Sequence, residues 1–66
     1  MKYYGLDAVI KDKGTTRKEL AEGIGMSYNA LSKRIIGLIE FDLKELRAIT
    51  DYLNLTTEEF KNIFLK

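Results

Sequence analysis

The strongest constraint in this sequence is the segment 16–37, in which two predicted helices are separated by only three residues. It reads TRKELAEGIGMSYNALSKRIIG. Thr16 and Glu19 have the spacing of a capping box, in which the threonine hydroxyl accepts from the Glu19 backbone N–H and the glutamate reaches back. The apolar residues that follow have helical spacing and are Leu20, Ala21 and Ile24, and Gly25 ends this helix.

The second helix of this pair begins at Ser27, whose side chain can cap it. Leu31 and Ile35, spaced i and i+4, predict its buried stripe. The short connection forces the two helices to cross steeply, at about 90–120°. Such a crossing needs a small residue where the backbones approach, which is Ala21. It also needs a residue that tolerates positive φ in the turn, which is Gly25.

Three further amphipathic helices flank this pair and predict an all-α fold. The first spans roughly 3–13, and the fourth and fifth begin at capping patterns at Asp42 and Thr56. Glycines at positions 14 and 37 stop the first and third helices. The predicted buried faces are Leu6, Val9 and Ile10 in the first helix, Leu43, Leu46, Ile49, Tyr52 and Leu53 in the fourth, and Phe60, Ile63 and Phe64 in the fifth. We expect five short helices forming one domain over residues 1–66, a length that holds a single small core.

The composition excludes several classes of function. The chain contains no cysteine and no histidine, so disulfides, zinc sites and histidine-based catalysis are not expected. We therefore predict no enzyme activity, no metal and no cofactor. No apolar run approaches the roughly 20 residues of a membrane span, and charged residues interrupt the N-terminal segment, which lacks the apolar core of a secretory signal. The expected location is the cytoplasm, with no membrane partner.

The formal net charge of +1 is unevenly distributed. Residues 14–37 carry four basic and two acidic side chains, whereas residues 38–66 carry four basic and six acidic ones. A chain that bound every polyanion strongly would be much more basic. The total charge therefore neither requires nor excludes a nucleic-acid partner, but the basic excess lies in the segment with the two close helices.

This segment resembles the helix-turn-helix of the Cro/repressor-like (XRE) family of phage and bacterial transcription regulators. The matching elements are Glu19-Leu20-Ala21 in the second helix, Gly25 in the turn, the polar segment 27–34, and Gly37. The resemblance continues over residues 6–14, 43–55 and 56–64, and so covers essentially the whole chain. It implies a compact five-helix lambda-repressor-like DNA-binding domain with the helix-turn-helix at helices 2 and 3. It also implies a double-stranded DNA operator as the partner and no small-molecule substrate.

In this family the third helix, here about 28–36, enters the major groove with its first residues facing base edges. The resemblance places base contacts at Ser27, Tyr28, Asn29, Ser32 and Lys33, and phosphate contacts at Thr16, Arg17, Lys18 and Arg34. Asn29 would pair with adenine and Lys33 with guanine, while Tyr28 would meet a thymine methyl or a phosphate. Structural roles compete at some positions. Thr16 and Ser27 also suit helix caps, and Lys18 and Arg34 also suit an ordinary solvated surface.

Two features depart from the family pattern. An aliphatic residue usually stands three after Leu31, where this chain has Arg34, so we expect the recognition helix to be rotated or slightly extended at its end. The loop 36–41 is nearly all apolar, whereas relatives carry a polar or basic loop that grips phosphate. Its apolar side chains predict a surface for a protein partner and are Ile36, Leu38, Ile39 and Phe41. The competing role, for the first and last of these, is to close the core.

Two functional hypotheses follow. The first is a sequence-specific DNA-binding transcription regulator of phage Cro/repressor type, with a place in a lysis–lysogeny switch. The alternative is a phage antirepressor or modulator with the same fold, which acts by binding a repressor protein. The apolar loop would form a homodimer contact under the first hypothesis and a complex with a phage repressor protein under the second.

Overall fold

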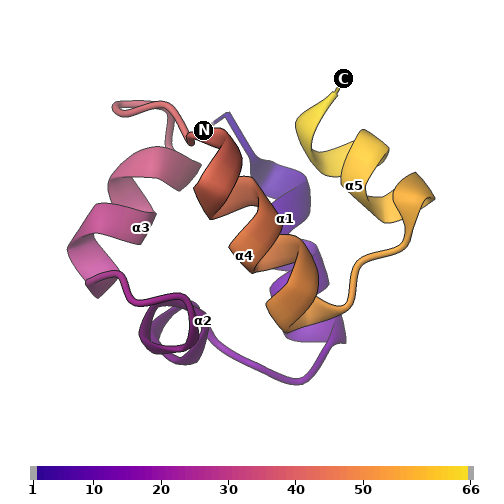
Figure 1. Ribbon diagram of the computed structural model, residues 1–66, viewed down its shortest axis with the longest axis horizontal. Coiled ribbons are helices and arrows are strands. Elements are labelled where there is room, and N and C mark those ends of the chain that lie inside the picture. The colour runs from indigo at the N-terminus through magenta and orange to yellow at the C-terminus, as the bar shows by residue number, and fades with distance from the viewer. Residues whose placement is uncertain (1, 66) are drawn as a thin grey trace.

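The computed structural model of the chain describes residues 2–65, except for the side chain of Tyr4. Within that range it contains five α-helices and no strand: α1 (Tyr4–Asp12), α2 (Arg17–Gly23), α3 (Tyr28–Ile35), α4 (Leu43–Leu53) and α5 (Thr57–Phe64). The prediction of an all-α fold with five helices is confirmed. Figure 1 shows α3 and α5 on opposite sides of α4, with α1 behind α4 and α2 near the start of α3. The longest of these helices has 11 residues, and none in the described range is long and apolar enough to cross a bilayer.

Side-chain caps start four of these helices at the predicted places. The capping oxygens each accept from a backbone N–H three residues later, at 2.7–3.1 Å, and belong to Thr16, Ser27, Asp42 and Thr56. Full capping boxes form at the starts of α4 and α5. At Thr16 the predicted box is half formed, because the Glu19 carboxylate accepts from the hydroxyls of Thr15 and Thr16 instead. These local bonds satisfy N–H groups that have no partner inside the helix.

The turn between α2 and α3 has the two small residues that a steep crossing requires. Ala21 is buried, and its carbonyl accepts from the Met26 N–H at 2.8 Å, which closes the turn. Gly25 has a φ of +75°, a conformation that residues with a side chain rarely adopt. The positive φ predicted for Gly25 is confirmed, and Ala21 is buried as predicted.

A third small residue, Gly23, lets α4 approach α2. The ring of Tyr52 in α4 lies against Gly23, and a methyl group added at this glycine would overlap the ring carbons. The sequence pattern predicts Tyr52 on the buried face of α4, whereas its side chain is partly exposed and covers the α2 backbone. The approach of α4 therefore depends on a glycine whose role the helical pattern does not indicate.

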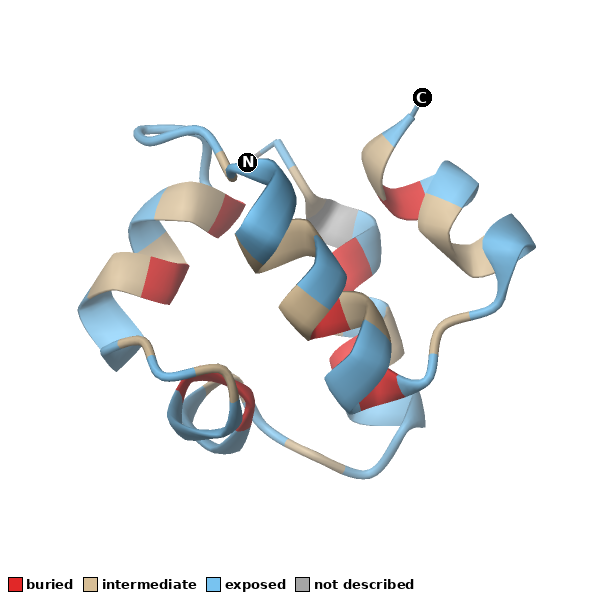
Figure 2. Ribbon diagram, viewed as in Figure 1, coloured by how far each residue is buried: buried red, intermediate tan, exposed pale blue. Residues whose placement is uncertain are grey.

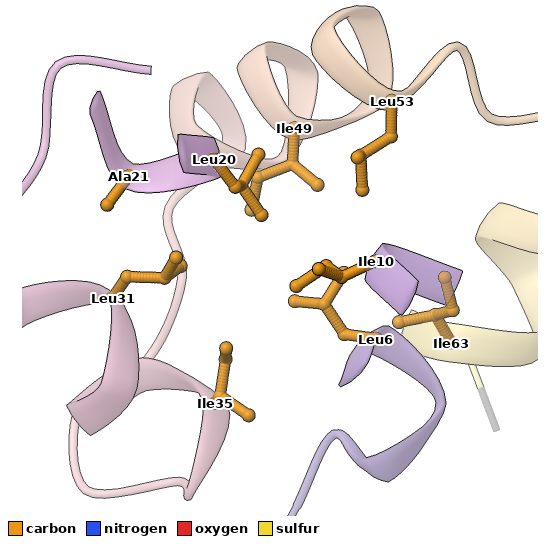
Figure 3. Packing of buried hydrophobic residues seen from close by; sticks show 9 residues of the cluster. All are labelled: Leu6, Ile10, Leu20, Ala21, Leu31, Ile35, Ile49, Leu53 and Ile63. Atoms are coloured by element: carbon orange, nitrogen blue, oxygen red, sulfur yellow. The ribbon is translucent and has the colours of Figure 1, made fainter. Parts of the chain in front are cut away.

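Among the residues whose burial the structure describes, nine are buried, all of them apolar, and they form a core to which all five helices contribute. They are Leu6, Ile10, Leu20, Ala21, Leu31, Ile35, Ile49, Leu53 and Ile63 (Figure 3). Each of them lies on a helical stripe predicted from the sequence. Figure 2 shows the buried part of each helix facing its neighbours. Removing this apolar surface from water is the main source of stability in so small a fold.

Three aromatic rings from distant parts of the chain pack together against this core. Tyr3 precedes α1, Phe41 precedes α4, and Phe64 ends α5. Their ring centroids lie 5.4–5.7 Å apart, a separation favoured by edge-to-face pairs. The Tyr3 N–H also donates to the carbonyl of Ile35 at 3.1 Å. Phe41 therefore takes the role of closing the core and contributes little to the predicted partner surface.

The core predicts the effect of one pair of substitutions. Leu31→Ala should lower the free energy of unfolding by about 2–5 kcal/mol, because it removes a fully buried side chain and leaves a cavity. Leu38→Ala is the matched control, since that side chain is 72% exposed and its loss should change stability by less than about 0.5 kcal/mol. Urea unfolding followed by circular dichroism measures both, and equal losses would contradict this core.

Candidate nucleic-acid interface

The start of α3 exposes the side chains that the sequence predicts to read DNA bases. Tyr28 is 51% exposed, and Asn29 and Lys33 are also exposed. Residues 29 and 33 are four apart and share one face of the helix. Leu31 and Ile35, on the other side, are fully buried. The geometry of α3 thus separates a core side from a side that presents a phenol, an amide and an ammonium group to solvent.

The two serines predicted to contact bases already have partners within the protein. Ser27 caps α3 and accepts from the Ala30 N–H at 3.1 Å. Ser32 is half-buried and accepts from the Nη1 atom of Arg17 at 3.2 Å. A hydroxyl that accepts one hydrogen bond retains its own proton for donation. Both serines therefore remain able to donate a hydrogen bond to a ligand.

Two of the predicted phosphate-contacting residues, Thr16 and Lys18, lie exposed at the start of α2. The Thr16 hydroxyl is the cap of this helix. Lys18 and Lys33 form no ion pair with any residue between 2 and 65. Among the basic residues predicted to contact DNA, these two lysines can therefore bind a phosphate or a base without breaking an ion pair.

Arg17, also predicted to contact phosphate, is engaged by α1 and α3. Its Nε and Nη2 atoms donate to the two carboxylate oxygens of Asp7 at 2.8 and 2.6 Å, and Nη1 donates to Ser32. The hydrogen bond to Asp7 raises the pKa of Arg17, and Tyr28 contributes a smaller rise. A single guanidinium group therefore joins three helices beside the residues predicted to read bases.

Arg34, the fourth residue predicted to contact phosphate, lies between α3 and α4. Its Nε atom donates to the Glu45 carboxylate at 3.0 Å, and its Nη1 atom donates to the Ala30 carbonyl at 2.9 Å. Both charged side chains are only 19% exposed. The sequence signal for this pair was the departure at position 34, where an arginine replaces the family's aliphatic residue. The arginine fills an inter-helix position and needs an acidic partner there.

The apolar loop after α3 is exposed except at its last residue, Phe41, which is half-buried. Ile36, Leu38 and Ile39 are exposed, and the adjoining Leu43 is exposed as well although the sequence pattern predicts it on the buried face of α4. The backbone N–H groups of Leu38 and Ile39 both donate to the Lys33 carbonyl, which holds the loop against the end of α3. We call Ile36, Leu38, Ile39 and Leu43 the apolar loop surface.

The two neighbouring cations of α3 predict contrasting effects on stability. Arg34→Gln should lower the free energy of unfolding by about 1–3 kcal/mol, because it leaves the partly buried Glu45 carboxylate without its charged partner. Lys33→Gln removes an exposed charge and should change it by less than about 0.5 kcal/mol. Thermal and urea unfolding measure both variants. Equal stabilities would mean that the Arg34–Glu45 pair does not hold α3 to α4.

A comparison with protein families identifies the family to which this chain belongs. A family model described as "Helix-turn-helix" matches residues 6–60, which include most of α1, all of α2 to α4 and the start of α5. Comparisons with curated proteins and with solved structures found no match. The matched family comprises DNA-binding regulators and not enzymes. The chain belongs to the Cro/repressor-like (XRE) family of helix-turn-helix DNA-binding transcription regulators.

Proposed function

We propose that this protein is a sequence-specific transcription regulator of the phage Cro/repressor type, with α3 in the major groove of a double-stranded operator. The observation that carries the proposal is the exposed set Tyr28, Asn29 and Lys33 on α3. The core makes no use of an aromatic ring or an amide at the first two positions. In a helix-turn-helix, the N-terminal residues of the second helix are the ones that reach base edges.

The three side chains have complementary chemistry for base recognition. The Asn29 amide carries a donor and an acceptor, which match the N7 and N6 atoms of adenine. The Lys33 ammonium donates to the O6 and N7 acceptors of guanine. The Tyr28 ring packs on a thymine methyl, or its hydroxyl contacts a phosphate. Ser27 and Ser32 add hydroxyl donors at the same end of the helix.

Phosphate contacts in this proposal come from Thr16 and Lys18. Arg34 is left out because its guanidinium lies between α3 and α4 and pairs with Glu45. Each phosphate that a protein neutralises steepens the dependence of log K on log salt by about 0.9. With so few unpaired cations on this face, we expect weak binding to arbitrary DNA and a shallow salt dependence.

A second candidate function is supported by the apolar loop surface. Its residues are exposed, and one of them, Leu43, also lines a groove of about 320 Å³ between α4 and α5. Contiguous exposed apolar surface commonly marks a site of protein–protein contact. On this ground the alternative is an antirepressor that binds a phage repressor protein. In the DNA-binding regulator, the same surface would serve a contact between two copies.

The base contacts can be tested on a duplex selected by the wild-type protein from a randomised library. Asn29→Ala and Lys33→Ala should each weaken binding by about 1–3 kcal/mol and relax the preference at one base pair, because each removes a direct contact to a base edge. Lys61→Ala is the matched control, since this exposed lysine lies on α5. Fluorescence anisotropy measures the affinities. A loss as large in the control would argue against reading by α3.

A double substitution separates the two candidate functions. Leu38→Ser with Ile39→Ser should leave monomeric binding to a single half-site intact, because neither side chain belongs to the α3 contact set. Should the wild-type protein select no sequence from the library and bind no DNA in a salt-dependent way, the DNA-binding proposal is wrong. Loss of a co-purifying repressor in the double variant would then establish the antirepressor.

A further inference from the structure

We infer that Arg17 is a positioning residue, which fixes the base-reading end of α3 through Asp7 and Ser32 and does not grip DNA phosphate. This inference rests on the proposed DNA-binding function. It changes the role that the family resemblance predicts for Arg17, and it gives Asp7 a role that the sequence analysis did not identify.

The geometry of the guanidinium group supports this role. The Nε and Nη2 atoms face the two oxygens of Asp7 at 2.8 and 2.6 Å, which is the paired fork geometry that arginine forms with carboxylates. The remaining Nη1 atom donates to the Ser32 hydroxyl at 3.2 Å. All three nitrogen atoms therefore have partners inside the protein. A phosphate that took the paired face of this group would have to displace the Asp7 carboxylate.

The location of the partners gives these bonds a consequence for recognition. Asp7 lies on α1 next to the fully buried Leu6, so it is anchored to the core. Ser32 lies one helical turn after Tyr28 on α3 and next to Lys33. The core side chains hold the inner side of α3, and the Arg17–Ser32 bond holds its flank. The network therefore limits rotation of the surface that carries the base contacts.

The charges also argue against a phosphate contact. The Asp7 carboxylate offsets the positive charge of Arg17 at close range, so the pair presents almost no net charge to an approaching DNA backbone. Asp7 itself repels phosphate. An arginine that bound phosphate would gain more from a neutral neighbour than from a bidentate carboxylate.

Arg17→Lys tests the inference, because lysine keeps the charge but cannot form the fork. The probes are the duplex selected by the wild-type protein and a scrambled duplex of the same composition. Arg17→Lys should reduce the ratio of selected to scrambled affinity by about tenfold, the loss typical of one hydrogen bond to a charged group. Ser32→Ala should reduce this ratio by at least as much, because it also removes a hydroxyl donor of the proposed contact set. Affinity for the scrambled duplex and the salt slope should stay unchanged. Lys18→Gln, at the adjacent exposed position, is the control and should lower the slope by about 0.9.

A double variant provides a second test, which asks whether the effects of the two substitutions on specificity are additive. If Arg17 acts through Ser32, Arg17→Lys should cause little further loss of specificity in a protein that already carries Ser32→Ala. Additive losses would overturn the inference. A second pair of results would also overturn it: wild-type specificity in Arg17→Lys, and a salt slope lower by about 0.9 in Arg17→Gln. These two results together are the ones expected of a phosphate contact.

The failure of the inference and the failure of the proposed function give different results. A wild-type protein that selects no duplex contradicts DNA recognition as a whole, whatever Arg17 does. A wild-type protein that selects a duplex, with Arg17→Lys unchanged, contradicts only the positioning role. Circular dichroism on each variant at the assay temperature confirms that a loss of specificity is measured on folded protein.

Discussion

The close packing of α2 against α3, with Ala21 buried, is the contact on which most of this structure depends. Because the turn at Gly25 is tight, Leu20 and Leu31 reach the same core from two crossing helices. In this arrangement α4 packs on α2 at Gly23, and the outer side of α3 stays exposed to solvent. The exposure of the predicted base-reading residues is therefore a result of how the core packs.

The arginines and the lysines of the helix-turn-helix have different roles. Arg17 and Arg34 are held between helices, each by a carboxylate on another helix. Lys18 and Lys33 are exposed and make no ion pair within residues 2–65. This division follows the chemistry of the groups, because a planar guanidinium loses little when it is fixed by several hydrogen bonds and an ammonium group is more strongly hydrated. The charge available to a polyanion is therefore smaller than the count of basic residues indicates.

Features set by nearby residues were predictable from the sequence, and features set by distant residues were not. Helical spacing identified the buried stripe of Leu31 and Ile35, and cap residues such as Ser27 identified the helix starts. The fork between Arg17 and Asp7 joins two helices whose relative placement no periodicity reveals. The half-formed capping box at Thr16 is a local exception, because the hydroxyl of the adjacent Thr15 also donates to the Glu19 carboxylate. The predicted DNA contacts rest on the family resemblance together with the exposure that the structure gives them.

The packing of Tyr3, Phe41 and Phe64 also bears on the order in which the chain folds. The crossing of α2 and α3 joins neighbouring segments and closes a short loop, whereas this aromatic cluster joins segments near both ends of the chain. Closing the longer loops costs more chain entropy, so the aromatic cluster loses more of it on forming than the helix pair does. During synthesis, the segment from Ile36 to Phe41 lacks one of its packing partners until Phe64 has emerged. The last packing contact of the most apolar loop therefore waits for α5 to be synthesised.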